Sequence, residues 1–214
     1  MKEVKYRYDI KQGTDAWIQA KDLKLSASRA TAIMANGKGL KSLVRELLTK
    51  HYSSGAHPAY SMEFQSSHMK RGNDYEATAR MIYEMETGNK VTEVGLVEMG
   101  KYIAVSPDGL IGEDGLLEIK NINDKDFLEL IINKKVDSNH RNQMQMQLYV
   151  TGRKWCDYFV FNPNFNPSHF MVRVYPDHDE YSRLMAGLQA GVRLIETEKA
   201  MLDKMLKAGK GDGN

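Results

Sequence analysis

The stretch Tyr102–Lys120 constrains this chain more than any other segment, because turn-forming residues divide it into short extended runs. Tyr102–Ser106 and Leu116–Lys120 have the alternating, largely apolar pattern of β-strands. Between them lie two breaks, Pro107–Gly109 and Glu113–Gly115, which favour turns. The sequence therefore predicts a hairpin-like unit made of two strands joined by a turn-rich link.

Charged residues near the second strand suggest a catalytic site. Because side chains alternate along a strand, Glu118 and Lys120 should share one face while Leu117 and Ile119 point into the core. If the hairpin brings Asp108 level with Glu118, two carboxylates can hold a hard cation beside an ammonium group. Magnesium prefers such oxygen ligands, lowers the pKa of bound water and neutralises a scissile phosphate. A surface hairpin with an incidental ion pair is the alternative.

Length and composition predict one domain over residues 1–206, with a disordered tail over residues 207–214. The 214 residues are 42% hydrophobic, which is enough for a core of two or three layers. Thirty basic and 28 acidic residues give a net charge of +2, so a nucleic-acid binder of this kind needs a localised basic patch. The single cysteine, Cys156, fits a core position in a reduced, cytoplasmic protein. No apolar run long enough to span a membrane is seen.

Helix starts near the N-terminus form a candidate anion site. One helix is expected to begin at Asp15, and Ser26–Ser28 suits the start of another over residues 29–35. Helix N-termini bind phosphates well, so Lys21 and Ser28 could flank such a site. A capping serine and a solvated lysine are the simpler interpretation. Lys38 is expected in a flexible basic loop.

Helical spacing and turn residues predict the remaining elements. Further helices are expected over residues 40–48, 73–87, 124–133, 139–151 and from Pro176 onward, and strands over residues 90–97, 153–161 and 169–175. On the helix over 124–133, the inward residues are expected to be Phe127, Leu128, Ile131 and Ile132. Glu76 lies near the start of its helix, as a third metal ligand or as a favourable partner of the helix dipole.

Three glutamines on the helix over 139–151 cannot all face one site. Gln143 and Gln147 are four residues apart and share a face, while Gln145 lies on the other side with Tyr149. At most one of these faces can look into an active site, and the residues alone leave open which of the three glutamines reaches it.

Four motifs in chain order resemble the PD-(D/E)xK nucleases, and more narrowly the lambda exonuclease (YqaJ-type viral recombinase) family. They are Arg71–Glu76, Ser106–Gly109, Glu118–Lys120 and Gln145 with Tyr149. The resemblance also takes in Asp15–Trp17 and Ser26–Ser28, and covers the chain from about Gly13 to Asp179. It implies an α/β (α+β) fold with a restriction-endonuclease-like core, in which helices flank a central mixed β-sheet.

The resemblance assigns roles to individual residues. The implied metal ligands are Glu76, Asp108, Glu118 and the main-chain carbonyl of Ile119, with Lys120 as the catalytic lysine. Among the glutamines it favours Gln145, with Gln143 as the fallback.

Contacts with DNA are implied as well. A pocket for the 5′-terminal phosphate falls on Lys21, Ser28 and Ser106, and DNA contacts fall on Lys38, Met69 and Arg71, with Met69 as an apolar wedge. The family has arginine where Lys21 stands. Lysine keeps the charge but loses the bidentate fork, so the strength of 5′-phosphate selection is open.

The implied activity is Mg²⁺-dependent 5′-to-3′ hydrolysis of one strand of linear double-stranded DNA, with two metal ions and Mn²⁺ as a substitute. Mononucleotides would be released and 3′ overhangs left for single-strand annealing. A homotrimeric ring around DNA, an annealing partner protein and a bacterial cytoplasm with phage or prophage origin belong to the same expectation. The alternatives are a structure-selective endonuclease or a non-catalytic DNA-binding protein of this fold. A Cas4-like nuclease needs several cysteines for its iron–sulfur cluster, which one cysteine cannot supply.

Overall fold

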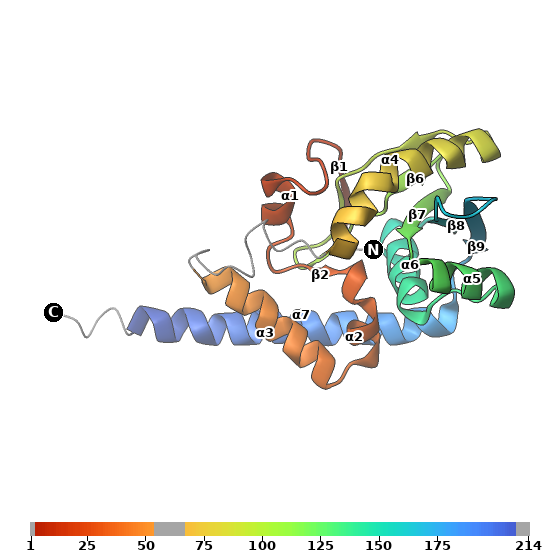
Figure 1. The fold of residues 1–214 in the computed structure, drawn as a ribbon. Helices are drawn as coiled ribbons and strands as arrows, with labels where there is room; N and C mark the ends of the chain where they lie inside the picture. The colour runs from red at the N-terminus through yellow and green to blue at the C-terminus, as the bar shows by residue number, and fades with distance from the viewer. Residues whose placement is uncertain (1–2, 54–66, 209–214) are drawn as a thin grey trace.

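The structure is a computed structural model that describes residues 3–53 and 67–208, with the side chains of all of these except residues 67–74. Within these ranges, helices and strands alternate in a mixed α/β arrangement, which confirms the expected fold class (Figure 1). The elements in chain order are β1 (Val4–Arg7), α1 (Asp15–Ala20), β2 (Leu25–Ser26), the 3₁₀ helix η1 (Ala27–Arg29), α2 (Ala30–Ala35), α3 (Lys38–Tyr52), α4 (Ser67–Thr87), β3 (Val91–Thr92), β4 (Leu96–Met99), β5 (Ile103–Val105), β6 (Gly109–Ile111), β7 (Gly115–Asn121), α5 (Asp124–Asn133), α6 (Ser138–Thr151), β8 (Trp155–Phe161), β9 (His169–Val174) and α7 (His178–Ala208).

The strands form two mixed sheets rather than the one central sheet that was expected. A four-stranded sheet has the order β1-β4-β5-β2, and a five-stranded sheet has the order β3-β6-β7-β8-β9. In each sheet one pair is parallel, β2 with β5 and β7 with β8, and the other pairs are antiparallel. A parallel pair needs a long crossover, and between β7 and β8 the helices α5 and α6 supply it.

The predicted hairpin is present, but its first strand is β6 and not residues 102–106. β5 lies in the four-stranded sheet, whereas β6 pairs with β7 in the five-stranded sheet. The break at Pro107 is therefore the place where the chain leaves one sheet for the other. A short strand after the break was missed because Gly109–Ile111 is only three residues long.

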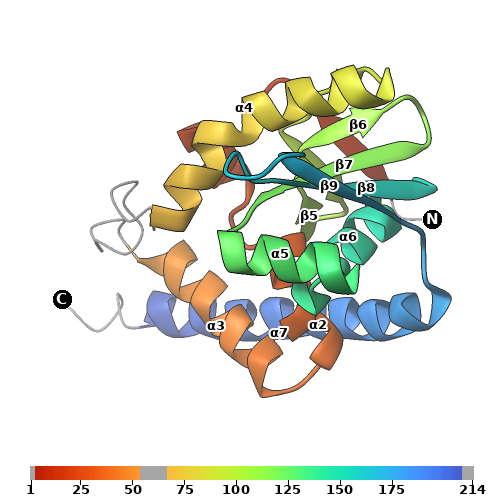
Figure 2. The ribbon, with the colours of Figure 1, turned by 45° about the vertical axis from the view of Figure 1, so that its right-hand side comes forward.

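Helices cover both faces of the five-stranded sheet. α4 packs against β7 and β8 on one face, and α6 packs against β8 and reaches the strands β4 and β5 of the other sheet. The long helix α7 runs across the far side of the molecule, against α2, α3 and α6 (Figures 1 and 2). Apolar residues follow these layers in a larger core beneath α2, α3, α6 and α7 and in a smaller core beneath α4. Cys156 is buried in the larger core, as expected.

Local sequence accounts for the ends of the helices. Thr14 caps α1 by accepting a hydrogen bond from the backbone N–H of Trp17, and Asn123 caps α5 through Asp126. Asp137 caps the start of α6, where its side chain accepts from two backbone N–H groups, and Gly152, with φ of 69°, caps its end. Glycine suits this left-handed position because it has no Cβ. The start of α6 in turn sets which of its side chains face the sheet.

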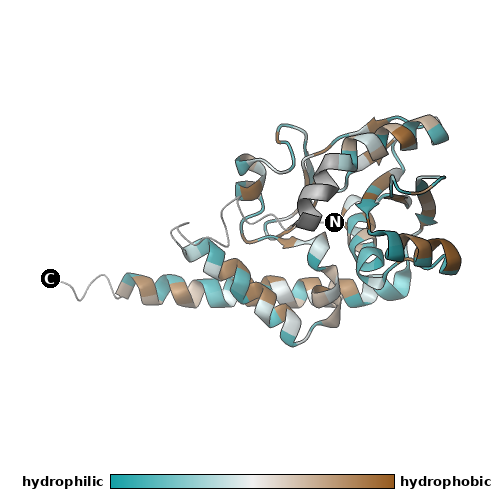
Figure 3. Cartoon of the chain, viewed as in Figure 1, coloured by the Kyte–Doolittle hydropathy of each residue, from teal (hydrophilic) through white to brown (hydrophobic). Residues whose placement is uncertain are grey.

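Three expectations about helices are wrong in detail. Leu128 and Ile132 are 49% and 68% exposed, so α5 buries Phe127 and turns these two residues outward. Lys38 is the first residue of α3 and does not lie in a loop. The predicted disordered tail begins too early, because α7 includes residues 207 and 208, and its remaining residues lie outside the described ranges. In Figure 3, brown and teal residues alternate along α7, as expected for a helix with one buried face.

No helix in the described part of the chain is long and apolar enough to cross a membrane.

Candidate active site

The β6–β7 hairpin brings Asp108 level with Glu118. Gly109 pairs with Leu117 in antiparallel register, so the residue before Gly109 lies opposite the residue after Leu117. The backbone N–H of Asp108 donates to the carbonyl of Leu117 at 3.1 Å, and its Oδ2 accepts from the backbone N–H of Ile119 at 2.6 Å. Asp108 is thus attached to β7 on both sides of Glu118. The sequence predicted a metal site only if the hairpin brings the two carboxylates level. The structure meets this condition.

Glu118 is a buried carboxylate with a hydrogen bond to each oxygen. Its side chain is 1% exposed. Oε1 accepts from the ammonium of Lys120 and from Nε2 of Gln143 at 2.6 Å. Oε2 accepts from Nε2 of Gln147 at 2.6 Å. Because a buried carboxylate costs free energy unless it is paired, these three donors account for its presence in the core.

The electrostatics of the pair follow from its burial. Burial raises the pKa of the Asp108 carboxyl well above its usual value, the negative charge of Glu118 raises it further, and Lys120 opposes the rise. Burial by itself lowers the pKa of Lys120, but Glu118 and Asp108 raise it by more, so the net shift is upward. With its pKa raised above the usual value, Lys120 is an ammonium ion at neutral pH. It is a hydrogen-bond donor here and not a ready base.

Glu76 lies close enough to Asp108 and Glu118 for its charge to affect Asp108, but it does not join them. Its Oε1 accepts from Nη2 of Arg80 at 2.6 Å, one turn along α4. Burial raises the pKa of Glu76, against the lowering effect of Arg80. Within residues 3–53 and 67–208, no three histidine, cysteine, aspartate or glutamate side chains are assembled as a metal site. Asp108 and Glu118 lie level with each other, whereas Glu76 is paired with Arg80 through one of its carboxylate oxygens.

The donor atoms at this site suit a hard divalent cation. Asp108, Glu118, Glu76 and the Ile119 carbonyl offer only oxygen, which Mg²⁺ and Mn²⁺ prefer. Oδ1 of Asp108 has no hydrogen-bond partner among the residues that the structure describes. The residues present fit such an ion without a histidine or cysteine ligand.

Gln145 does not reach the acidic residues, and its choice over Gln143 is wrong. Its Nε2 donates to the carbonyl of Tyr175 at 2.8 Å, and its Oε1 accepts from the backbone N–H of Asp177 at 2.9 Å. Gln145 therefore ties α6 to the segment before α7. The opposite face of α6, with Gln143 and Gln147, meets Glu118. The i, i+4 spacing of these two glutamines placed them on one face in the sequence, but it did not decide which face meets the acidic residues.

The three residues expected at a phosphate pocket are connected in part through Trp17, which belongs to a segment of the family resemblance but was given no role there. The ammonium of Lys21 lies 3.8 Å from the centre of the Trp17 ring, and the indole N–H donates to Oγ of Ser106 at 3.0 Å. Ser28 is exposed, and its hydroxyl lies 3.3 Å from that of Ser26. β2 and β5 are parallel, so Ser28 and Ser106 follow the same ends of two neighbouring strands.

Lys21 is an unusual lysine. Burial lowers its pKa to about 8, with a further contribution from the charge of Lys50. It forms no ion pair with a carboxylate in the described part of the chain. A partly buried cation beside another cation is costly, and here the face of the Trp17 ring is its nearest favourable partner; a bound anion would lower the cost further.

The other predicted DNA contacts are spread out. Lys38 is exposed at the start of α3. The backbones of Met69 and Arg71 belong to α4, but their side chains lie outside the described residues, so the wedge at Met69 and the contact at Arg71 stay predictions.

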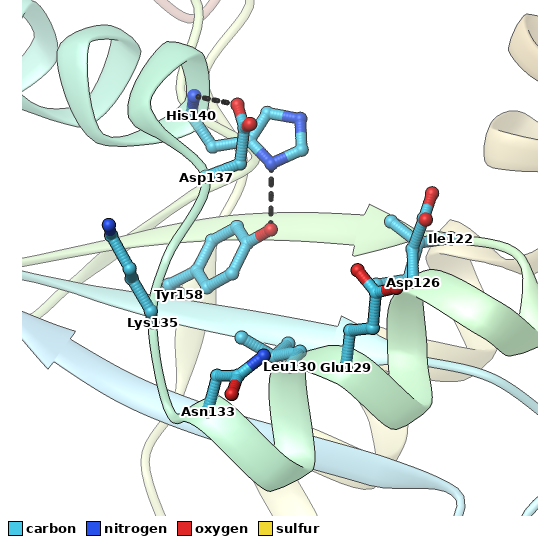
Figure 4. Close-up of a pocket in the computed structure, with 9 residues that line it drawn as sticks. All are labelled: Ile122, Asp126, Glu129, Leu130, Asn133, Lys135, Asp137, His140 and Tyr158. Atoms are coloured by element: carbon cyan, nitrogen blue, oxygen red, sulfur yellow. Dashed lines mark hydrogen bonds between the residues drawn. The ribbon is translucent and has the colours of Figure 1, made fainter.

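A pocket of about 470 Å³ lies next to the acidic residues, between α5 and the start of α6 (Figure 4). On its wall, Nδ1 of His140 lies 2.7 Å from the hydroxyl of Tyr158, which pairs with Glu118 across β7 and β8. Burial lowers the pKa of His140, and the positive charge of Lys120 lowers it further. Among the described residues that line the pocket, none is Asp108 or Glu118, so the pocket adjoins the candidate site but does not contain it.

Comparison with known sequences and structures gives concordant results. Residues 16–154 match the sequence model of the YqaJ-like viral recombinase domain. No curated protein matches the chain. Among solved structures, the chain is similar to an alkaline exonuclease, LHK-Exo, from Laribacter hongkongensis. The identity is 31% over 92% of this chain and 99% of the other, with a TM-score of 0.80.

Two further structures agree with this fold. LHK-Exo in complex with dAMP matches at 31% identity, over 92% of this chain and 99% of the other, with a TM-score of 0.79. A phage related exonuclease from Haemophilus somnus 129PT covers 84% of this chain and 96% of its own. It has 13% identity and a TM-score of 0.60, and so bears on the fold alone. The core is of the restriction-endonuclease-like type that the motifs implied.

Proposed function

The chain belongs to the YqaJ-like viral recombinase family, and from this premise we propose that it is a Mg²⁺-dependent exonuclease. It degrades one strand of linear double-stranded DNA from the 5′ end, releases mononucleotides and leaves 3′ single-stranded overhangs. The observation that carries the proposal is the placement of Asp108 opposite Glu118 with Lys120 bound to Glu118. A mononucleotide, dAMP, is bound in one structure of the exonuclease from Laribacter hongkongensis, which supports the proposed product class.

The metal ligands are Asp108, Glu118, the carbonyl of Ile119 and, once released from Arg80, Glu76. Two Mg²⁺ ions, or Mn²⁺ in their place, would neutralise the scissile phosphate and supply an activated water at this site. Asp108 offers its unpartnered oxygen, and its other oxygen keeps the hairpin closed by accepting from Ile119.

Lys120 and Gln143 act at Oε1 of Glu118, and their own side chains are partly exposed. The Lys120 side chain is 25% exposed, and Gln143 is partly buried. Both donate to Oε1 of Glu118, and both can turn a donor toward a phosphate oxygen or the attacking water. Because Lys120 is protonated at neutral pH, its role begins with orienting the substrate, and proton transfer requires cations nearby to lower its pKa.

Selection of the 5′ end is assigned to Lys21, Ser28 and Ser106. The support is the uncompensated charge of Lys21 and its link to Ser106 through Trp17. An ammonium is a point charge without the two-pronged geometry of arginine, so the preference for a 5′-phosphate is weaker than arginine would give. Lys38, Met69 and Arg71 are proposed to contact the duplex.

The assembly in which the enzyme acts is a homotrimeric ring that encloses DNA, and it works with a single-strand annealing protein in the cytoplasm of a bacterial host. A net charge of +2 supports enclosure, because bulk attraction to DNA is weak for a nearly neutral protein. In a ring, phosphate contacts hold the DNA in place without reading its sequence.

The function is tested with a linear duplex that carries either a 5′-phosphate or a 5′-hydroxyl, in the presence of Mg²⁺. The wild type should release mononucleotides from the 5′ ends, faster from the phosphorylated duplex. Lys120→Ala should lose activity by about 100-fold or more, the scale of losing one preorganised donor in a catalytic site.

Lys154→Ala is the matched control. It removes a lysine from an exposed ion pair with Asp114 at 2.9 Å, at the turn end of the same hairpin, and should leave turnover unchanged. Unchanged turnover in Lys120→Ala contradicts the site assignment. Cleavage of circular duplex at the same rate as linear duplex contradicts the exonuclease assignment and favours an endonuclease.

A further inference from the structure

We propose that Gln147 is a positioning residue that fixes the carboxylate of Glu118 in the orientation in which it would serve as a metal ligand. The inference rests on the proposed metal-dependent function, and it concerns a residue to which neither the family resemblance nor the comparisons give a role.

The two oxygens of Glu118 have different surroundings. Oε1 accepts from Lys120 and Gln143, whose side chains are partly exposed. Oε2 accepts from Gln147, which is 0% exposed. Oε2 is thereby held against α6 by a fully buried donor, and this contact fixes the plane of the carboxylate.

The contact dictates how the Gln147 amide is turned. A carboxylate is an acceptor only, so the amide must present its N–H group to Glu118. This leaves Oε1 of Gln147 buried and without a hydrogen-bond partner among the described residues. An unpaired buried acceptor is costly, and here the charge-assisted hydrogen bond to Glu118 offsets that cost.

Gln147 reaches Glu118 because α6 lies along this face of β7. It is four residues after Gln143, so the two amides stand one above the other and bind one carboxylate oxygen each. On the other face of the helix, Gln145 binds the segment before α7 and makes no contact with Glu118. A rigid element and a locked rotamer are the requirements for positioning a metal ligand.

Partners that orient a metal ligand typically change metal affinity by about 10- to 100-fold when they are removed. We therefore expect Gln147→Met, which keeps the volume but removes the donor, to weaken Mn²⁺ binding by about tenfold or more. The free protein is titrated with Mn²⁺ by calorimetry in the absence of DNA. Hydrolysis assays then measure two quantities for Gln147→Met. The Mn²⁺ concentration that gives the half-maximal rate should rise, and the maximal rate should change less.

Gln145→Met is the matched control, because it removes an equally buried glutamine from the opposite face of the same helix. It should lose thermal stability but keep the Mn²⁺ affinity of the wild type. Gln147→Asn keeps the amide but places it one methylene further from Glu118, so this variant should bind Mn²⁺ with intermediate affinity. It provides the test if Gln147→Met does not fold.

A folded Gln147→Met or Gln147→Asn protein with wild-type Mn²⁺ affinity overturns the inference, as does an equal loss in Gln145→Met. Wild-type protein that binds no Mn²⁺ refutes the metal-dependent function itself, and the role of Gln147 with it. A wild type that binds Mn²⁺ while the Gln147 variants bind it equally well refutes the role of Gln147 alone.

Discussion

The lysine in the proposed phosphate pocket should make recognition of the 5′-phosphate depend on pH near 8. Burial and the charge of Lys50 lower the pKa of Lys21 from 10.5 to about 8. With that pKa, roughly 90% of the free enzyme carries a charged Lys21 at pH 7 and roughly 10% at pH 9. The preference for a 5′-phosphate over a 5′-hydroxyl should therefore fall by up to about tenfold between these pH values.

The same shift has a counterpart in stability. A lowered pKa in the folded state means that the unfolded chain binds more protons between about pH 8 and 10.5, so this group makes the free energy of unfolding rise with pH in that window. A shift of this size corresponds to roughly 3 kcal/mol. Lys21→Met should therefore stabilise the protein at pH 7, and the gain should disappear above about pH 10.5. Urea unfolding at several pH values measures the effect.

The assay for recognition is kcat/KM on duplexes with a 5′-phosphate or a 5′-hydroxyl, because its pH dependence reports groups of the free enzyme. Lys21→Arg stays charged throughout the range and adds a bidentate fork, so its preference should be larger and independent of pH. Lys50→Gln removes a cause of the lowered pKa and should move the wild-type midpoint to higher pH. A wild-type preference that is constant from pH 7 to 9, or a decline of equal size in Lys21→Arg, refutes the reasoning.

Two further predictions concern the framework that carries the site. Arg173→Met leaves Asp157, which is 0% exposed and accepts from Arg173 at 2.7 and 2.9 Å, without its cation. It should cost about 3–5 kcal/mol in urea unfolding, and adding Asp157→Asn should restore part of the loss. Gly187→Ala places a methyl group against the backbone carbonyl of Ile33 where α7 crosses α2, and should cost about 1–3 kcal/mol. Gly39→Ala, whose methyl group would make only ordinary contact at 3.6 Å, should be neutral or stabilising; equal losses in the two glycine variants would contradict this account.

The strand that carries Glu118 and Lys120 could be predicted because its information is local. The alternation in Leu116–Lys120 and the turn at Glu113–Gly115 determine a hairpin, and the length of the turn aligns Asp108 with Glu118. The same local rules place Glu118 and Lys120 on one face of β7, where the structure joins them by an ion pair.

Features that depend on packing between distant segments could not be predicted. In α5, the apolar residues cover a side of the helix that is broader than the part buried against the core, so periodicity did not single out the buried residues, and Leu128 and Ile132 were placed inward although they are exposed. For the glutamines of α6, spacing separated the two faces, but only the position of α6 over β7 decides between them. Which strands share a sheet depends in the same way on contacts far apart in the chain, so the division into two sheets was missed.

The effect of the Glu76–Arg80 ion pair on the site also depends on packing between distant segments. Both residues lie on α4 with an i, i+4 spacing that favours an ion pair, and this contact competes with a role in metal binding. The spacing was visible in the sequence, but its consequence for the acidic residues was not, because the distance from α4 to β7 is set by the smaller core.

The most direct test of the central claim is the anomalous scattering of Mn²⁺ in crystals of the wild-type protein. We predict an Mn²⁺ ion bound by oxygens of Asp108 and Glu118, with Glu76 turned away from Arg80 to join them. The claim would be contradicted if the protein shows full Mn²⁺-dependent activity but its crystals hold the ion elsewhere, with Glu118 bound only by Lys120, Gln143 and Gln147.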